Sequence, residues 1–516
     1  MTRAALLTLA SALLHALAFP PWDWWPLAFV ALVPFISALD GVSVRRAVWL
    51  GLLWGVAAHW AEAAWVLPAM RDYYQQPLWF AFLFGVVSSL LFRGLHYALF
   101  AVVATWLTRG RRGVGPVLLW AATWVAFELL RARGPTADPW LLLGYALVPS
   151  TALLQAADLG GVYLLSFVVA LVNAALAHTV GSAGGLPARR ALALAAASLL
   201  ALASYGQWRL AAPLPDGRPV PIAVVQGNND LGAQWRAEHY GAGLETYLSL
   251  SRQVAARTHP ELFIWPESAV TFFLAREPRY LAAIQQMLAE TGSELVAGAP
   301  HIEDPDPARP EFYNAAFAVD ASGIRARYDK QRLLPFAEYF PLHFVEFLRR
   351  SFGRVRSFTP GADLAPLPTR LGPAAVVICF EAVFPELVRD RMRAGAAVLL
   401  NLSNDAWLGR GSGPAQHLAM VVPRAVEERT TVIRATTTGI SAIIDPRGVV
   451  HDATPLFDAA VITADVTPGA GDTLYGRYGD WFAYTCVASV LLAAARKLLN
   501  TDEHRCHQDP QGAGAG

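Results

Sequence analysis

The sequence predicts a chain with two parts, a polytopic helical membrane bundle and an α/β domain. Two observations support this division. The 516 residues are 55% hydrophobic and only 16% charged, whereas soluble globular chains average about 25% charged. The apolar excess lies in residues 1–210 and again near 480–499, while residues 215–475 alternate short apolar runs with helix-like stretches. Such alternation favours a layered α/β fold. The expected strands are Pro221–Val225, Leu262–Trp265, Glu294–Ala297, Ala315–Asp320, Ala374–Cys379, Ala397–Leu402, Thr431–Thr436, Ile440–Ile444 and Ala459–Asp465.

Eight apolar stretches account for the membrane part. A spanning helix needs about 20 mostly apolar residues. The predicted spans are Ala4–Phe19, Leu27–Leu39, Ala47–Leu67, Leu78–Leu95 (or to Leu107), Val114–Leu130, Val162–Val180, Ala191–Leu210 and Trp481–Leu499. The first two are short. Residues 1–19 also have the length of a signal peptide, but no clear small-residue cleavage site follows them, so a span is the favoured interpretation.

Arginine placement predicts the orientation of these spans. With the N-terminus in the cytoplasm, the inside loops hold Arg45-Arg46, the cluster Arg109–Arg112 and Arg189-Arg190, and the outside loops hold fewer. Seven spans then deliver the α/β domain to the periplasm of a bacterium with two membranes. The expected parts are a bundle over 1–210, a linker over 211–219, an α/β domain over 220–475, a C-terminal span over 480–500 and a cytoplasmic tail over 501–516.

Charge and cysteine content limit the function. The net charge of +1 gives no sign of nucleic-acid binding. Cys379 is the only cysteine of the predicted outer domain. Because structural cysteines in the periplasm usually pair, an unpartnered one is either an inert buried side chain or a reactive thiol. We expect neither a metal site nor a cofactor.

The chain contains only two lysines, Lys330 and Lys497, and otherwise uses arginine for positive charge. A biased genome explains the scarcity by itself, so the informative question is why residue 330 is not arginine. The pKa of a lysine moves readily on burial, whereas arginine stays protonated and its guanidinium is wider. Lys330 is therefore either a chance survivor or a site residue.

Three further polar residues follow apolar runs. Glu267 follows Leu262–Trp265, Cys379 follows Ala375–Ile378, and Asn404 follows Val398–Ser403. Chemistry in open α/β sheets gathers at the carboxyl ends of strands.

These residue types suit acyl transfer. A thiol needs activation, which a buried carboxylate can supply as base, and an ammonium stabilises the oxyanion formed on attack at a carbonyl. Glu267, Lys330 and Cys379 thus form a coherent site that works through a thioester. A Cys–His pair stays open, although no histidine is adjacent in sequence.

Three segments carry a family resemblance. They are Trp265-Pro266-Glu267-Ser268; Lys330 with Leu333, Pro335, Phe336 and Glu338; and Cys379-Phe380-Glu381 with Phe384-Pro385-Glu386. Their order and spacing resemble the signature segments of the nitrilase superfamily, which implies an αββα sandwich and a Glu–Lys–Cys triad. Together with the predicted spans, nearly the whole chain resembles the bacterial apolipoprotein N-acyltransferases.

The resemblance implies residue roles. Glu267 is the general base, Lys330 the oxyanion partner and Cys379 the nucleophile. The supporting residues are Glu338, which helps hold the lysine, Glu381, Asn404 in a family-like segment, and Trp235, which matches a tryptophan near the substrate entrance. Phe380 stands where tyrosine is common, so the oxyanion contact is expected from its backbone N–H.

The implied reaction has two steps. Cys379 takes an acyl chain from a phospholipid, usually phosphatidylethanolamine, and passes it to the α-amino group of the lipidated N-terminal cysteine of a diacylglyceryl-apolipoprotein. This places the chain in lipoprotein maturation, in the inner membrane with its catalytic domain in the periplasm. We expect a monomer.

Residues 335–358 are a candidate lipid entrance. Aromatic side chains there, among them Phe340, Phe344 and Phe347, alternate with arginines. An apolar face with basic flanks is typical of an interfacial segment. A helix that covers the domain core explains the same pattern.

Two other functions stay open. One is a tethered hydrolase of a small amide or nitrile, although a tether needs a single span. The other is a transporter or scaffold with an inactive outer domain, because ionisable residues within spans often mark transport sites. Those in or near the predicted spans are His59, Glu62, Arg93, His96 and Glu128.

Overall fold

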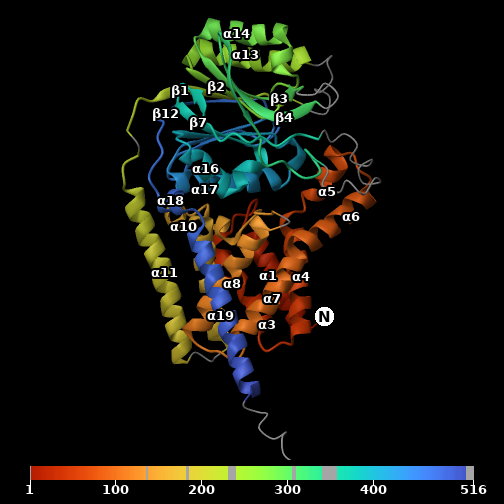
Figure 1. Ribbon diagram of the computed structural model, residues 1–516, viewed down its shortest axis with the longest axis vertical. Coiled ribbons are helices and arrows are strands. Elements are labelled where there is room, and N and C mark those ends of the chain that lie inside the picture. The colour runs from red at the N-terminus through yellow and green to blue at the C-terminus, as the bar shows by residue number, and fades with distance from the viewer. Residues whose placement is uncertain are drawn as a thin grey trace, which may run out of the picture.

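The computed structural model describes residues 2–134, 137–181, 185–214, 216–229, 240–304, 310–339 and 357–506. Over these residues a helical bundle carries an α/β domain on one of its ends (Figure 1). Trp235, Phe340, Phe344 and Phe347 lie outside the described residues.

The bundle is built mainly from long apolar helices. Its elements are α1 (Arg3–Leu17), η1 (Trp25–Leu27), α2 (Ala28–Ala31), α3 (Val33–Leu39), α4 (Val44–Glu62), α5 (Val66–Pro68), η2 (Ala69–Tyr73), α6 (Leu78–Ser88), η3 (Ser89–Gly94), α7 (Leu95–Thr108), α8 (Val114–Arg133), η4 (Leu143–Leu147), α9 (Thr151–Leu154), α10 (Ala157–Gly181), α11 (Leu186–Leu210) and α19 (Trp481–Cys506). Helix α11 leads up to the α/β domain, and α19 returns from it along the bundle (Figure 1).

The expected membrane character is confirmed, and the span count is smaller than eight by length and composition. Within the described chain five helical stretches are long and apolar enough to cross a membrane, and a sixth results if α4 and the α5–η2 segment, bent by 68°, are one span. The first two predicted spans are the shorter apolar helices Arg3–Leu17 and Trp25–Leu39. The third predicted span is interrupted where α4 ends at Glu62.

Buried ionisable side chains of the bundle form ion pairs within it. Glu62 lies 3.0 Å from Nη1 of Arg93 and 2.5 Å from Nδ1 of His15. Arg131 lies 2.9 Å from Asp138. Each of these buried charges therefore lies beside an opposite charge, which offsets part of the cost of its burial.

Glycines allow the closest helix contacts. A Cβ at Gly51 would collide with the carbonyl oxygen of Tyr97, and one at Gly55 with the backbone of Arg93. Helix α4 therefore approaches η3 and α7 at backbone distance, which is how membrane helices gain packing energy where water gives none.

The α/β domain has two six-stranded sheets packed face to face. One has the order β12-β1-β2-β3-β4-β5 and the other β11-β10-β9-β8-β7-β6. The strands are β1 (Val220–Gln226), β2 (Leu262–Trp265), β3 (Glu294–Glu303), β4 (Glu311–Asp320), β5 (Gly323–Asp329), β6 (Leu367–Thr369), β7 (Gly372–Ile378), β8 (Val398–Ser403), β9 (Val432–Thr436), β10 (Ala442–Ile444), β11 (Val450–Ala453) and β12 (Ala460–Val466). The central pairs β1–β2, β2–β3, β7–β8 and β8–β9 are parallel.

Helices cover both outer faces of the sheets. The inner faces bury Val224 and Ile264 of the first sheet against Val376 and Leu400 of the second. Helices α13 (Tyr240–Thr258) and α14 (Pro278–Thr291) pack on the first sheet, and α16 (Pro385–Arg393) and α17 (Gly413–Glu428) lie between the second sheet and the bundle (Figure 1). The expected αββα sandwich is confirmed.

Several strands differ from the prediction. Strands β5, β6 and β11 were not predicted, because charged and polar side chains interrupt their apolar alternation; β5 carries Arg325 and Arg327. Strand β3 was expected only as Glu294–Ala297 but continues to Glu303, because the antiparallel partner β4 supplies backbone pairs from Leu295↔Val319 to Glu303↔Glu311.

Gln416 on α17 joins the two parts of the chain. Its Oε1 accepts hydrogen bonds from the indoles of Trp65 (3.1 Å) and Trp140 (3.0 Å), and its Nε2 donates to the carbonyls of Pro20 (3.1 Å) and Glu62 (2.9 Å). The amide is buried, and its oxygen and its nitrogen each make two hydrogen bonds. Since the four partners lie in the bundle, the α/β domain is held in a defined position on its end.

Candidate active site

The residues predicted from strand ends meet at one place in the sandwich. Strand β2 ends two residues before Glu267, β7 immediately before Cys379, β8 immediately before Asn404, and β5 immediately before Lys330. The first and last of these strands belong to one sheet and the other two to the second. The site is therefore formed jointly by the carboxyl ends of strands from both sheets.

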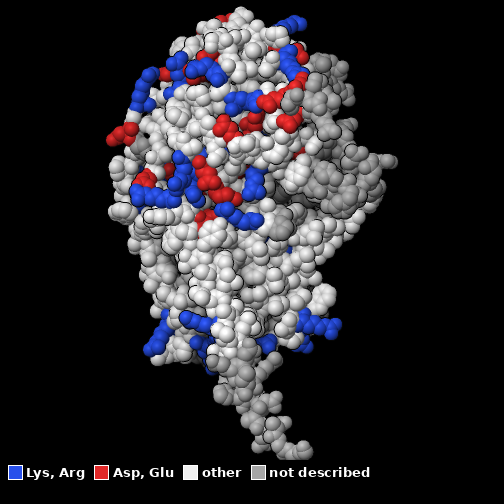
Figure 2. Space-filling view, viewed as in Figure 1, with Lys and Arg blue, Asp and Glu red and all other residues white. Residues whose placement is uncertain are grey.

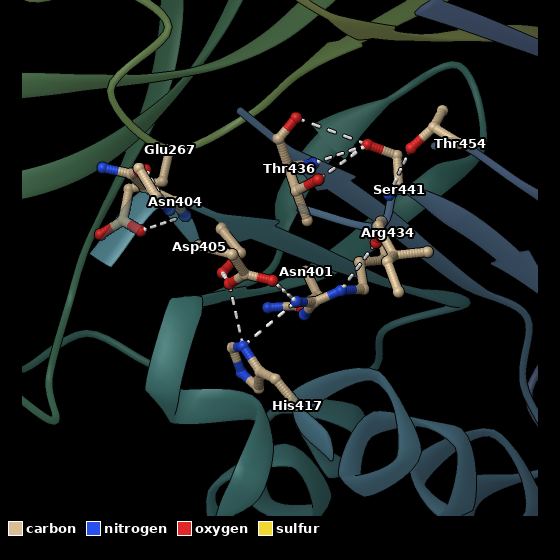
Figure 3. A network of polar contacts seen from close by, with 12 residues as sticks. Glu267, Asn401, Asn404, Asp405, His417, Arg434, Thr436, Ser441 and Thr454 are labelled. Carbon is tan, nitrogen blue, oxygen red and sulfur yellow. Dashed lines mark hydrogen bonds and ion pairs between the residues drawn. The ribbon is translucent and has the colours of Figure 1, made fainter. Parts of the chain in front are cut away.

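Glu267 is held from both sides of the sandwich. Its Oε1 accepts a hydrogen bond from Nδ2 of Asn314 (2.7 Å), and its Oε2 accepts one from the backbone N–H of Asn404 (2.8 Å; Figure 3). Burial raises the pKa of Glu267 above its ordinary value; Glu338 adds to the rise, while Lys330 and the two hydrogen bonds oppose it. A buried carboxylate with a raised pKa is suited to accept a proton near neutral pH.

Lys330 is 1% exposed and lies between two carboxylates. Its Nζ is 2.9 Å from both oxygens of Glu338 and 3.5 Å from Oε1 of Glu267. Burial alone lowers the pKa of Lys330, but the two carboxylates outweigh it and hold the pKa above its ordinary value. The ammonium therefore stays charged in a site closed to water.

Asn314 was missed by the sequence reasoning. It lies on β4, and its Nδ2 donates to Glu267 (2.7 Å) and to Oε1 of Glu338 (2.6 Å). Its backbone carbonyl oxygen also accepts a hydrogen bond from the backbone N–H of Lys330 (2.8 Å). One residue thus sets the spacing of both carboxylates and of the lysine. The only signal in the sequence was an amide at the polar start of the apolar run Ala315–Val319.

Cys379 stands on a sharp turn from β7 into the 3₁₀ helix η7 (Cys379–Val383). Its φ of 53° lies in the left-handed region, which residues other than glycine, asparagine and aspartate rarely adopt. Burial, reinforced by Glu267, raises the pKa of the thiol to about 12, against the opposing effects of Lys330 and Ser403. The resting thiol is therefore protonated and needs a base before it can attack.

Glu381 fastens the lysine loop to the cysteine turn. Its Oε1 accepts the backbone N–H groups of Gln331 (2.7 Å) and Arg332 (3.0 Å), and its Oε2 accepts that of Ile378 (2.7 Å). The hydroxyl of Tyr328 donates to the same carboxylate. Glu381 is fully buried. Its hydrogen bonds hold the loop after β5 against the turn after β7.

Phe380 packs away from the polar cluster. Its ring meets that of Phe384 edge-on at 5.0 Å between centroids. Its side chain offers no donor to the site, so a contribution from this residue has to come from its backbone.

A second polar network surrounds Asp405, next to Asn404 (Figure 3). Asp405 accepts hydrogen bonds from Ser403 (2.7 Å) and from Nη2 of Arg434 (2.6 Å), and its Oδ1 lies 3.0 Å from Nδ1 of His417. Burial and the neighbouring Arg434 lower the pKa of His417, so the imidazole is neutral at neutral pH. The described residues show no hydrogen bond from His417 to the thiol of Cys379, which weighs against a Cys–His pair.

The same network extends to the far edge of the sandwich. Oε1 of Gln226, at the end of β1, accepts the hydroxyls of Thr436 (3.0 Å), Ser441 (2.7 Å) and Thr454 (2.8 Å). These bonds tie the first sheet to the second beside the site.

Comparisons with known proteins agree with this architecture. Residues 11–175 match the family model of the apolipoprotein N-acyltransferase N-terminal domain, and residues 221–473 match that of the carbon-nitrogen hydrolases. A protein of Geobacter metallireducens named apolipoprotein N-acyltransferase is 38% identical over 510 residues, which cover 97% of this chain and 96% of that protein. One of the same name from Azotobacter vinelandii is 35% identical over 492 residues, covering 92% of each chain.

Among solved structures, a mutant of the Nesterenkonia AN1 amidase from the nitrilase superfamily aligns with 52% of this chain and 96% of its own, at 17% identity and a TM-score of 0.38. The family assignment rests instead on the full-length relatives and on the two family models, which together span the bundle and the α/β domain. The chain belongs to the apolipoprotein N-acyltransferase family.

Proposed function

We propose that the chain transfers a fatty acyl chain from a membrane phospholipid, through a thioester on Cys379, to the α-amino group of the lipidated N-terminal cysteine of an apolipoprotein. The proposal divides the chain into a bundle over 1–210, a linker over 211–219, a catalytic domain over 220–475, a C-terminal span over 480–500 and a tail over 501–516. The observation that carries it is the buried cluster of Glu267, Lys330 and Glu338 around Asn314, next to a cysteine with a positive φ.

The first half-reaction loads the enzyme. Glu267 takes the proton of the Cys379 thiol as Sγ attacks the ester carbonyl of the phospholipid. The positive charge of Lys330 stabilises the oxyanion, and the backbone N–H of Phe380 donates a hydrogen bond to it. When the tetrahedral intermediate collapses, the C–O bond breaks, and the lysophospholipid oxygen takes the proton back from Glu267. Since burial raises the pKa of Glu267, the carboxyl is suited to both transfers.

The second half-reaction uses the same groups. The α-amino group attacks the thioester carbonyl and gives a proton to Glu267, Lys330 again faces the oxyanion, and the C–S bond breaks. The leaving thiolate takes the proton and becomes the thiol again. A raised thiol pKa favours this return, because the protonated thiol is its stable resting form.

Glu338, Glu381 and Asn404 would support the triad. Glu338 balances the charge of Lys330, Glu381 aligns the loops of Lys330 and Cys379, and the backbone of Asn404 orients Glu267. We assign Trp235 to the substrate entrance by family resemblance alone.

Phosphatidylethanolamine is the proposed donor, and the chain is proposed to act as a monomer in the bacterial inner membrane with its catalytic domain in the periplasm. The basic side chains at the end of the bundle opposite the α/β domain support this orientation (Figure 2). The acceptor is also a lipid-anchored molecule, so both substrates would reach the site from the membrane surface.

The segment with Phe340, Phe344 and Phe347 is the proposed lipid entrance. Charging it, as in Phe344→Asp, is expected to impair acyl transfer from bilayer phospholipid more than thioester formation with a short soluble ester. Equal loss with both donors would overturn the entrance role and favour a helix that covers the core.

An assay with purified enzyme tests the function. It contains phosphatidylethanolamine labelled in its acyl chain and a synthetic diacylglyceryl peptide with a free α-amino group. Label on the peptide amine, absent when that amine is blocked and absent with Cys379→Ala, is the expected result. Release of free fatty acid only, with no label on the peptide, would instead indicate a hydrolase.

The transporter alternative is tested with bundle variants. A transporter should lose function in Glu62→Gln or Arg93→Gln while Cys379→Ala leaves it intact. We expect the reverse for the acyl transfer assay, provided that the bundle variants stay folded in detergent. The pairing of Glu62 with Arg93 and His15 gives these charges a structural role.

A further inference from the structure

A cavity of about 490 Å³ opens at the end of the bundle farthest from the α/β domain. The ends of α3, α7, α8 and α10 surround it. Its apolar walls include Ile36, Leu39, Val117, Trp120, Ala174 and Ala177. Arg109, Arg111 and Arg112, from the loop between α7 and α8, line it as well. The cavity lining thus combines apolar side chains with three cationic ones.

The three arginines have no acidic partner among the described residues. None of them forms an ion pair with any residue in the described ranges, whereas the arginines near the α/β domain, such as Arg133 and Arg429, pair with carboxylates. Among the hydrogen bonds of the described residues, only Arg109 of the three contributes one, to the carbonyl oxygen of Val42. In the view of Figure 2 this end of the bundle carries basic side chains and no acidic ones. The positive charges of the three arginines are therefore available to a ligand or to solvent.

Other polar groups around the cavity do not offset this charge. Asp40 lines the cavity but is exposed, and it is the single carboxylate of the lining. Nε2 of His178 accepts the backbone N–H of Gly113 (3.1 Å). Oγ1 of Thr105 is buried and has no hydrogen-bond partner among the described residues, so it adds a free hydroxyl to the lining.

We propose that this cavity binds the headgroup of an anionic phospholipid, with the phosphate against Arg109, Arg111 and Arg112. Guanidinium groups bind phosphate oxygens in a bidentate fashion, and basic pockets between membrane helices suit anionic headgroups. The glycerol and first acyl carbons would contact the apolar wall of Trp120 and Ala177. Because the cavity lies at the end of the bundle farthest from the α/β domain, which holds Cys379, this lipid is distinct from the acyl donor.

Arginines elsewhere at the same end provide a matched control. Arg45, Arg46 and Arg189 are exposed, form no ion pair with the described residues and do not line the cavity. Replacing them removes the same charge from the same membrane surface. General attraction to an anionic leaflet should therefore suffer equally in both triple variants, while headgroup binding should suffer only when the cavity arginines change.

Native mass spectrometry of the full-length protein in detergent tests the proposal, with phosphatidylglycerol, phosphatidylethanolamine or inorganic phosphate added. The wild type is expected to retain one phosphatidylglycerol at concentrations where phosphatidylethanolamine is lost. The triple variant R109Q/R111Q/R112Q should bind phosphatidylglycerol roughly 100-fold more weakly, and R45Q/R46Q/R189Q should bind it like the wild type.

A second variant guards against misinsertion of the arginine variant. Ala177→Leu fills the cavity without changing any charge and is expected to weaken lipid binding while acyl transfer is retained. Equal affinity for both phospholipids, or equal loss in the two triple variants, would overturn the proposal. Displacement of the lipid by inorganic phosphate at equal concentration would also overturn it, because the site would then recognise a free anion without using its apolar wall.

Discussion

The ammonium of Lys330 lies 3.5 Å from the nearest oxygen of Glu267, and both groups are almost completely buried. This pair places a fixed positive charge beside the carboxylate that we propose as the base. Glu338, 2.9 Å from the same ammonium, keeps the lysine charged and in place. The space between the two carboxylates fits the compact ammonium of a lysine, whereas the guanidinium of an arginine is wider.

Lys330→Arg is therefore expected to keep the charge but lose acyl transfer by about 100-fold or more, the size of effect seen when an oxyanion donor is misplaced. The measurement is the rate of thioester formation with labelled phospholipid. The chain offers a matched control, since Lys497→Arg changes the only other lysine and should be fully active. A nearly active Lys330→Arg would mean that residue 330 needs only a cation.

The acid limb of the pH profile should report Glu267. Below its pKa the carboxyl is protonated and accepts no proton from the thiol, so kcat/KM falls as the pH decreases. Because burial raises this pKa, the midpoint is expected above the ordinary value of about 4.3. No increase in rate is expected near pH 8.5 from thiol ionisation, because the thiol pKa is raised to about 12. A profile that is flat down to pH 4 would argue against Glu267 as base.

Asn314→Ala should shift that limb further. The variant removes a donor to Glu267 that opposes the rise of its pKa, so the acid midpoint is expected to move to higher pH. It should also lower the free energy of unfolding by about 1–3 kcal/mol, because two buried carboxylates lose a hydrogen bond. Asn229→Ala, which removes only a hydrogen bond to the carbonyl of Gly243, is the control. An unchanged midpoint would contradict the positioning role of Asn314.

Gln416→Leu should loosen the α/β domain on the bundle. The variant leaves the indoles of Trp65 and Trp140 and the carbonyls of Pro20 and Glu62 without this partner. Each buried group that stays unpaired costs about 1–3 kcal/mol, so thermal unfolding in detergent should begin at a clearly lower temperature. Gln253→Leu, at an exposed position on α13, should unfold like the wild type. Equal unfolding temperatures would mean that apolar packing alone joins the two parts.

The sequence predicted the strand-end residues because they interrupt clear apolar runs. Glu267, Cys379 and Asn404 each follow such a run, and their strands end where the pattern stops. Lys330 was identified from its residue type and its motif instead. Its strand β5 carries Arg325 and Arg327 at the edge of a sheet, so hydrophobic alternation gives no signal there.

Asn314 was not predictable from local pattern. Its importance comes from contacts with residues 47 and 24 positions away in sequence, which exist only after β4 pairs with β3 and β5. The hydrogen bonds of Gln416 are the same kind of case, since their partners lie 276 to 396 positions away.

Fewer helices pass a length criterion than the eight apolar stretches of the sequence, because some of these stretches form shorter or broken helices. Apolar composition does not distinguish a full span from a shorter helix buried in a bundle. Helix α1 has only 15 residues, and it buries polar side chains such as Ser11 and His15 against its neighbours. Such polar side chains are buried because of tertiary contacts, which local sequence patterns do not reveal.

The proposed mechanism depends on a thioester on Cys379, which mass spectrometry of the intact protein purified from membranes can detect. After incubation with phospholipid, we expect a mass increase of one fatty acyl group on Cys379. The adduct should be released by hydroxylamine, absent in Cys379→Ala and retained in Cys486→Ala. A folded wild-type protein whose Cys379 stays unmodified under these conditions would rule out the thioester mechanism.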